Sequence, residues 1–147
     1  MRQPDDSART GRLWDATGLL LTALLALVVA HDVDHVVNES RLGELSAVFW
    51  AFLPLQYATY LAVLALVWRR NDAAPVLAAA LSAISILGFA GAHLVPFGPL
   101  PYADGDPLAI SWALVFVPMG VAAATFAVAL RLWSLTRGAH AARPAST

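Results

Sequence analysis

Four long apolar segments, separated by short polar ones, constrain this chain more than any other feature of its sequence. A helix needs about 20 apolar residues to cross a hydrocarbon core of about 30 Å, and each segment is long enough. Of the 147 residues, 59% are hydrophobic and 13% are charged, whereas about a quarter of a soluble domain is charged. The sequence therefore predicts an all-α, polytopic membrane protein with the lipid bilayer as its surroundings.

The expected spans cover residues 13–37, 45–68, 73–95 and 108–133. At about 1.5 Å per residue, the first span reaches about 37 Å. The segment 96–107 contains four prolines and two glycines and is predicted to be the longest loop. Residues 1–12 and 134–147 are polar tails, and the first of them is expected to be disordered. We expect one membrane domain built as a four-transmembrane-helix bundle.

The arginines are distributed unevenly over the two sides of this arrangement. Eight of the nine basic residues lie on the side of the two termini, and only Arg41 lies on the other. Cytoplasmic loops carry the excess of basic residues, so both termini are predicted to be cytoplasmic. All basic residues are arginine, and alanine, leucine, valine and proline are abundant. This usage is typical of a GC-rich bacterial genome, and we expect a multi-pass protein of a bacterial cytoplasmic membrane.

The segment 31–35 (HDVDH) places four ionisable side chains directly after the apolar run of the first span. Ionisable residues in or beside a span are costly and commonly functional. On a helix, His31, Asp34 and His35 lie on one face, because residues three and four apart are neighbours. Asp32 lies on a second stripe beside His35. The segment is the first candidate for a functional site.

A third histidine is expected at the same depth. His93 lies near the outer end of the third span, about as far along its helix as His31 along the first. The first and third spans run parallel in a four-helix bundle, so their histidines can meet. Imidazole nitrogens and carboxylates are ligands that zinc, copper and iron accept. We therefore predict an outward-facing transition-metal site with His31, His35, His93 and Asp34 as ligands.

Further acidic residues are expected around this site, either orienting the imidazoles or closing over the ion. They are Asp32, Glu39, Asp104 and Asp106. An open coordination position would make a bound water acidic enough to act as a nucleophile. The sequence leaves open whether the site is catalytic.

Two other interpretations of the cluster stay open. In one, the carboxylates pair with the histidines or with Arg41 in a structural network, and the protein is a non-catalytic membrane subunit or scaffold. In the other, His93 and one first-span histidine are the axial ligands of haem b. The chain has no cysteine, which excludes thiolate ligands and c-type haem attachment. Its basic residues are too scattered for nucleic-acid binding.

The histidine spacing resembles the zinc-protease signature H-E-x-x-H, with Asp32 in the place of the glutamate. Asp104-Gly105 resembles the Asp-Gly motif that intramembrane site-2 proteases carry on another span. Here the carboxylate is one methylene shorter, and Asp104 falls in a proline-rich loop. Proteolytic activity is therefore not carried over to this chain.

The second span carries polar residues of its own. Gln56, Thr59 and Tyr60 are predicted to share a face near Pro54 and to point into the bundle. One interpretation is that they bond backbone carbonyls that Pro54 leaves free. The other is that Gln56 and Tyr60 form the floor of a ligand pocket beneath the histidines, with Phe89 in its lining.

Small residues follow one side of the third and of the fourth span. They allow close approach of another helix, either within the bundle or in a homo-oligomer or membrane partner. These residues are Ser82, Ser85, Gly88, Gly91 and Ala92, and Gly120, Ala123, Ala124 and Ala127.

The first span also resembles a secretory signal peptide, with an arginine-rich start, an apolar run and small residues before His31. Cleavage there would leave three spans and a terminal histidine whose amine and ring together can hold copper. The polar residues continue on a helical period beyond this point, which favours an uncleaved span.

Overall fold

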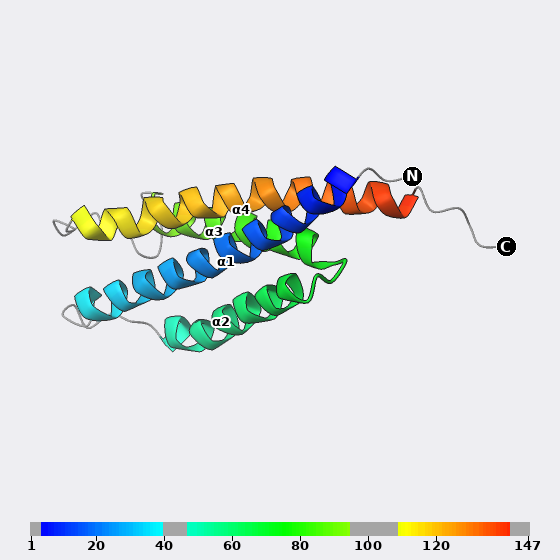
Figure 1. Cartoon of the computed structure of the whole chain (residues 1–147). Helices are drawn as coiled ribbons and strands as arrows, with labels where there is room; N and C mark the ends of the chain where they lie inside the picture. The colour runs from blue at the N-terminus through cyan, green and yellow to red at the C-terminus, as the bar shows by residue number, and fades with distance from the viewer. Residues whose placement is uncertain (1–3, 40–46, 95–108, 142–147) are drawn as a thin grey trace.

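The computed structural model describes residues 4–39, 47–94 and 109–141, with side chains in 7–37, 50–94 and 110–138. These ranges form four helices and no strand (Figure 1). The helices are α1 (Pro4–Glu39), α2 (Ala47–Trp68), α3 (Ala74–His93) and α4 (Ala109–Ala141). Each is long and apolar enough to cross a membrane. The predicted all-α membrane bundle is confirmed.

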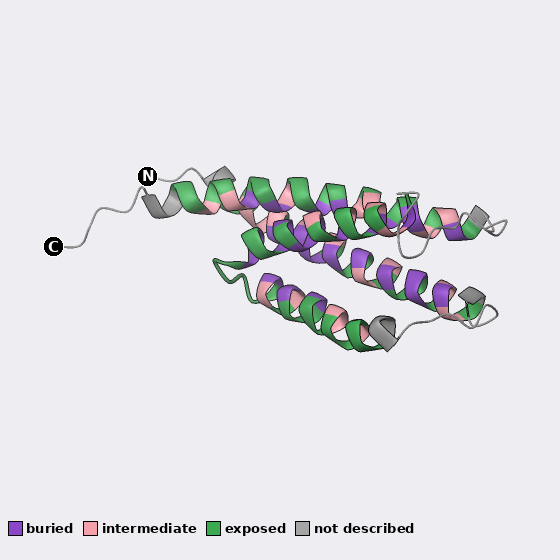
Figure 2. Ribbon diagram, turned by 180° about the vertical axis from the view of Figure 1, so that it is seen from behind, coloured by how far each residue is buried: buried purple, intermediate pink, exposed green. Residues whose placement is uncertain are grey.

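The four helices alternate in direction along the chain. α1 and α3 run one way and α2 and α4 the other, so both ends of the chain lie at the same end of the bundle (Figure 1). α4 packs along both α1 and α3, which contact each other little. α2 lies beside α1 and has the smallest buried share of the four (Figure 2). The arrangement places the C-terminal halves of α1 and α3 at one end, as their predicted parallel course requires.

Aliphatic and small side chains fill the space between α1, α3 and α4. Leu21 and Leu24 of α1 and Leu132 of α4 are fully buried. On α3 most of the buried residues are small, and among them Ala78 and Ser82 are fully buried. Small side chains let the helix backbones approach closely, and dispersion contacts rather than water exclusion hold such helices together in lipid.

The small-residue sides predicted for α3 and α4 divide between two surroundings. Ser82 and Ser85 are buried inside the bundle. Gly88, Gly91 and Gly120 are exposed, and a Cβ added at any of them would meet no described atom within 4 Å. The buried part therefore serves packing within the chain, and docking of a partner on the exposed part stays a prediction.

Two helices extend into segments expected to be tails. α1 begins at Pro4 rather than near residue 13, and α4 continues to Ala141 rather than ending near residue 133. Proline suits the first helical position, and the acidic residues that follow it in the first turn are favoured at the positive end of the helix dipole. At the other extension, the guanidinium of Arg137 lies 5.2 Å from the ring centre of Trp133. The prediction of a disordered segment is therefore wrong for residues 4–12.

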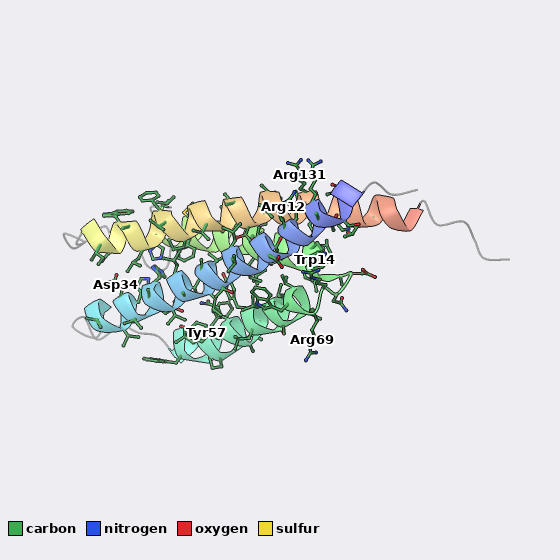
Figure 3. All side chains as sticks on the ribbon, viewed as in Figure 1. Arg12, Trp14, Asp34, Tyr57, Arg69 and Arg131 are labelled. Carbon is green, nitrogen blue, oxygen red and sulfur yellow. The ribbon has the colours of Figure 1, made fainter. Side chains whose placement is uncertain are left out.

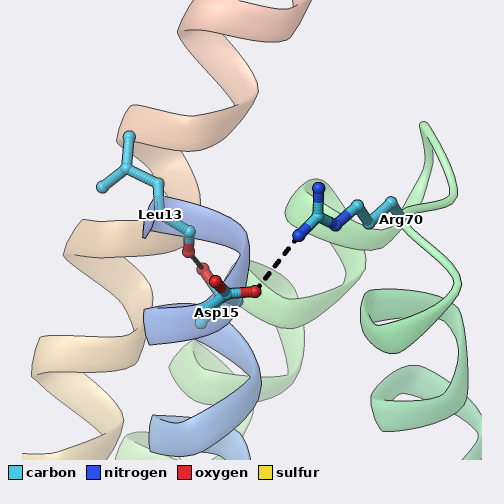
Figure 4. Close-up of polar contacts among 4 residues, drawn as sticks. Leu13, Asp15 and Arg70 are labelled. Carbon is cyan, nitrogen blue, oxygen red and sulfur yellow. Dashed lines mark hydrogen bonds and ion pairs between the residues drawn. The ribbon is translucent and has the colours of Figure 1, made fainter. Parts of the chain in front are cut away.

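The turn between α2 and α3 is tight. Arg70, two residues after the end of α2, has a φ of 51°, a left-handed conformation that commonly follows the end of a helix. The side chain of Asn71 accepts a hydrogen bond of 3.0 Å from the backbone N–H of Ala73, just before α3. The guanidinium of Arg70 contacts Asp15 of α1 at 3.3 Å (Figure 4). This exposed ion pair joins the turn to α1 at the arginine-rich end of the bundle.

Candidate metal centre

Three histidines meet near the ends of α1 and α3. His31 and His35 lie one turn apart on α1, and His93 is the last residue of α3. The Nε2 atom of His31 lies 3.0 Å from Nε2 of His35 and 3.1 Å from Nε2 of His93. Only 6%, 2% and 6% of the surfaces of His31, His35 and His93 are exposed. The prediction that first-span and third-span histidines meet at one depth is confirmed by these distances.

Nε2 of His35 and Nε2 of His93 both approach Nε2 of His31. His31 is nearly perpendicular to His35 and to His93, with interplanar angles of 89° and 86°. The rings of His35 and His93 are stacked, with centres 5.1 Å apart. Phe89, one turn before His93, covers His31 with a centre-to-centre distance of 4.8 Å. The aromatic ring of Phe89, predicted above to line a pocket, shields the cluster on this side.

Hydrogen bonds alone cannot satisfy all the ring nitrogens in this arrangement. An imidazole nitrogen has one in-plane position, which holds either a proton or a lone pair. Nε2 of His31 can therefore make one well-directed hydrogen bond, although two other ring nitrogens lie within 3.1 Å of it. Its Nδ1 is buried and has no hydrogen-bond partner among the described residues. An ion placed between the three lone pairs would use all of them.

The spacing of the nitrogens fits a small metal ion. One ring nitrogen from each histidine lies within 4.8 Å of the other two, and the three could hold a metal ion. With Zn–N distances of about 2.0–2.1 Å and tetrahedral angles, neighbouring nitrogens lie about 3.3 Å apart. The two short contacts of 3.0 and 3.1 Å are close to this separation. Two of the three nitrogen–nitrogen separations therefore already lie near the value expected for zinc.

The other predicted ligand, Asp34, lies on the same helix between the two histidines. Its side chain is half-buried and lies on the side of α1 away from α2 (Figure 3). Among the described residues, the three histidines form a group of mutually close candidate ligands, and Asp34 is not part of that group. Coordination by Asp34 stays a prediction. The side chain of Glu39 and all of Asp104 and Asp106 lie outside the described residues.

Asp32 faces α2 instead of the ring nitrogens of the histidines. Its Oδ2 accepts hydrogen bonds from the hydroxyl of Tyr57 at 2.6 Å and from the amide of Gln56 at 3.1 Å. Asp32 is buried, and Tyr57 points from α2 toward α1 (Figure 3). Sequence reasoning missed Tyr57. Its position next to Gln56 in an apolar span could have indicated its role, because a tyrosine hydroxyl inside a span needs a hydrogen-bond partner.

The polar side chains that were expected to share one face of α2 point in three different directions. Tyr60 is buried and forms a hydrogen bond of 2.6 Å with Ser85 of α3. Ser85 donates its own proton to the backbone carbonyl of Leu81, so Tyr60 is the donor to Ser85. Thr59 is exposed and bonds the carbonyl of Leu55 in its own helix. The prediction that Thr59 points into the bundle is wrong, because the helix backbone already satisfies its hydroxyl.

Comparison with models of protein families, with curated proteins and with solved structures finds no match to this chain. Any functional conclusion therefore depends on the geometry of the site itself.

Proposed function

We propose that this chain is a multi-pass membrane protein that binds a transition-metal ion through His31, His35 and His93. The observation that carries the proposal is the convergence of three imidazole nitrogens from two helices, within 4.8 Å of one another. Neutral imidazole is a common ligand of zinc, copper and iron. Burial of the cluster keeps water from competing for the ion.

Three histidines leave at least one coordination position for another group. In catalytic zinc sites three protein ligands hold the ion, and water or substrate takes the fourth position. Asp34, on the same turn, is the protein group that we propose as an additional ligand or as a partner that orients an imidazole. Elemental analysis of the purified protein would identify the ion as zinc, copper or iron.

The geometry favours a bare ion over haem b. Axial histidines approach haem iron from opposite faces of a macrocycle, so the porphyrin plane separates them. Here the facing nitrogens of His31 and His93 are 3.1 Å apart, and that separation leaves no room for a ring between them.

The competing function is a membrane subunit whose histidine cluster is only structural. Separations of 3.0 and 3.1 Å also suit nitrogen–nitrogen hydrogen bonds. The exposed small-residue sides of α3 and α4 would then dock a partner helix. The unbonded Nδ1 of His31 speaks against a network built for hydrogen bonding, because such networks stabilise only when all members are satisfied.

We further propose that the site faces the outside of a bacterial cytoplasmic membrane. Arg12, Arg69 and Arg131 lie at the end of the bundle away from Asp34 (Figure 3), where both chain ends also lie (Figure 1), and basic residues mark the cytoplasmic side. The ion would therefore be exchanged with the extracytoplasmic space.

Elemental analysis of the purified full-length protein, together with an absorption spectrum, tests the proposal. We expect a stoichiometric metal ion that is lost in His31→Ala and in His93→Ala. His140→Ala is the matched control, because residue 140 lies in the last turns of α4, at the other end of the bundle. Wild-type protein without metal after incubation with zinc, copper and iron would support the structural subunit, and a Soret band would support haem.

Loss of fold would also remove the metal, so each variant is checked by size-exclusion chromatography and circular dichroism. His93→Gln is the second variant, because it keeps a polar side chain of similar length while removing the imidazole. We expect it to elute and melt as the metal-free wild type does, and to hold no metal. Retention of metal in folded His93→Gln would overturn the three-histidine assignment.

A further inference from the structure

Asp32 is a buried carboxylate on the same helix turn as two of the histidines. It follows His31 directly and precedes His35 by three residues, and 7% of its surface is exposed. Side chains three residues apart on a helix are neighbours, with Cβ atoms about 5–6 Å apart. The carboxylate therefore lies beside the cluster, although it points toward α2.

The partners of Asp32 hold it in this direction. Tyr57 and Gln56 both donate to Oδ2, at 2.6 and 3.1 Å. Both donors are neutral, and no arginine of the described ranges forms an ion pair with Asp32. A buried carboxylate inside a span is costly unless a positive charge lies near it.

The three histidines lack a negative charge, whereas Asp32 lacks a positive one. Neutral imidazoles bring no charge to the site, so a bound metal ion would place its full positive charge among apolar side chains. Moving an ion out of water carries a large desolvation penalty, which a nearby opposite charge reduces. A metal ion bound by the histidines would therefore supply the positive charge that Asp32 lacks, and Asp32 would supply the negative charge that the ion needs.

We infer that Asp32 is the counter-ion of the three-histidine centre, held beside it but out of the coordination sphere by Tyr57 and Gln56. The inference rests on the proposed metal binding at His31, His35 and His93. Asp32 then acts on the ion through its charge, without coordinating it, and makes the site bind ions of higher charge more tightly. Among the described residues, α2 contributes Gln56 and Tyr57 to the site, which together with Asp32 of α1 form a carboxylate clamp.

A comparison of two redox-inert ions of different charge tests this inference. Zn(II) and Ag(I) are titrated separately into metal-free wild-type protein and into Asp32→Asn, which keeps the shape of the side chain. Coulomb energy is proportional to the charge of the ion. Removal of the carboxylate should therefore weaken Ag(I) binding about 10-fold and Zn(II) binding about 100-fold.

The control variants separate charge from structure. Tyr57→Phe keeps the carboxylate and removes one bond of the clamp, so it should change the zinc-to-silver affinity ratio by less than about threefold. Asp15→Asn removes an exposed carboxylate at the other end of α1 and should change neither affinity. Asp32→Ser provides a second neutral variant, judged by the same ratio, where Asp32→Asn does not fold.

The outcomes distinguish this inference from the proposed function. Wild-type protein that binds neither ion overturns the metal site. Wild-type protein that binds an ion, with equal fold-losses for both ions in the neutral Asp32 variants or with no loss, overturns only the counter-ion role. A larger loss for Zn(II) than for Ag(I) supports it.

Discussion

Gly18 of α1 lies directly against the indole of Trp68 at the end of α2. A Cβ at Gly18 would lie 2.9 Å from Cζ2 of Trp68 and 3.0 Å from Cη2. The missing side chain thus lets the larger ring approach the backbone of α1. Together with the Asp15–Arg70 ion pair at 3.3 Å (Figure 4), this contact joins α2 to α1 at the end opposite the histidines.

Gly18→Ala should destabilise the bundle by about 1 kcal/mol, because the added methyl group displaces the indole. Trp68 is half exposed, so it can move and limit the cost. Unfolding in detergent, followed by tryptophan fluorescence, measures the change. Gly11→Ala is the control, since a Cβ there meets no described atom within 4 Å. In a Trp68→Leu background the penalty should shrink, and an undiminished penalty would contradict the steric explanation.

The Tyr60–Ser85 bond should behave as a coupled pair. Ser85→Ala leaves a buried phenol without its acceptor, which costs about 1–2 kcal/mol. Tyr60→Phe removes the donor and leaves Ser85 bonded to Leu81 at 2.7 Å, so its cost should be smaller. The double variant should be more stable than the sum of the single changes indicates, by about 0.5–1 kcal/mol. Additive changes in unfolding free energy would show that the pair is not coupled.

Bound metal should raise the thermal stability of the chain through its histidines. A ligand at about 100 times its Kd stabilises the native state by about 2.7 kcal/mol, and we expect a rise in Tm of about 5–10 °C. Differential scanning fluorimetry with and without the ion identified by elemental analysis provides the measurement. The rise should vanish in His93→Ala. An equal rise in that variant would place the ion elsewhere.

The absence of cysteine from the chain permits a direct test of its orientation. Single substitutions Ser7→Cys and Ser40→Cys are labelled in intact cells with a membrane-impermeant maleimide. We expect labelling of position 40 in intact cells and of position 7 only after lysis, because the arginine-rich end should be cytoplasmic. The reverse pattern would place the histidine cluster on the cytoplasmic side.

The fold and the histidine cluster could be predicted from the sequence because simple periodicities specify them. Long apolar runs indicated the spans, and the spacing of His31 and His35 placed both on one helix face. His93 lies at the matching depth of the third span, which runs parallel to the first. The meeting of its Nε2 with that of His31 at 3.1 Å follows from these facts together.

The contacts of α2 could not be predicted in the same way. This helix is strongly apolar overall, and its few polar side chains point in several directions, so no single polar face fixes its rotation about its own axis. The orientation that brings Tyr57 to Asp32 and turns Thr59 outward depends on local packing. The extension of α1 back to Pro4 escaped prediction for another reason, since charge content alone does not separate a polar helix from a polar tail.

The separation of 62 positions between His31 and His93 in the sequence has a consequence for biogenesis. During synthesis the first two of the proposed ligands enter the bilayer well before the third, so the proposed coordination set would be complete only after α3 has been inserted and has packed beside its neighbours. Metal loading would therefore report that insertion has reached the third helix. Chains stalled earlier would lack a ligand and release the ion.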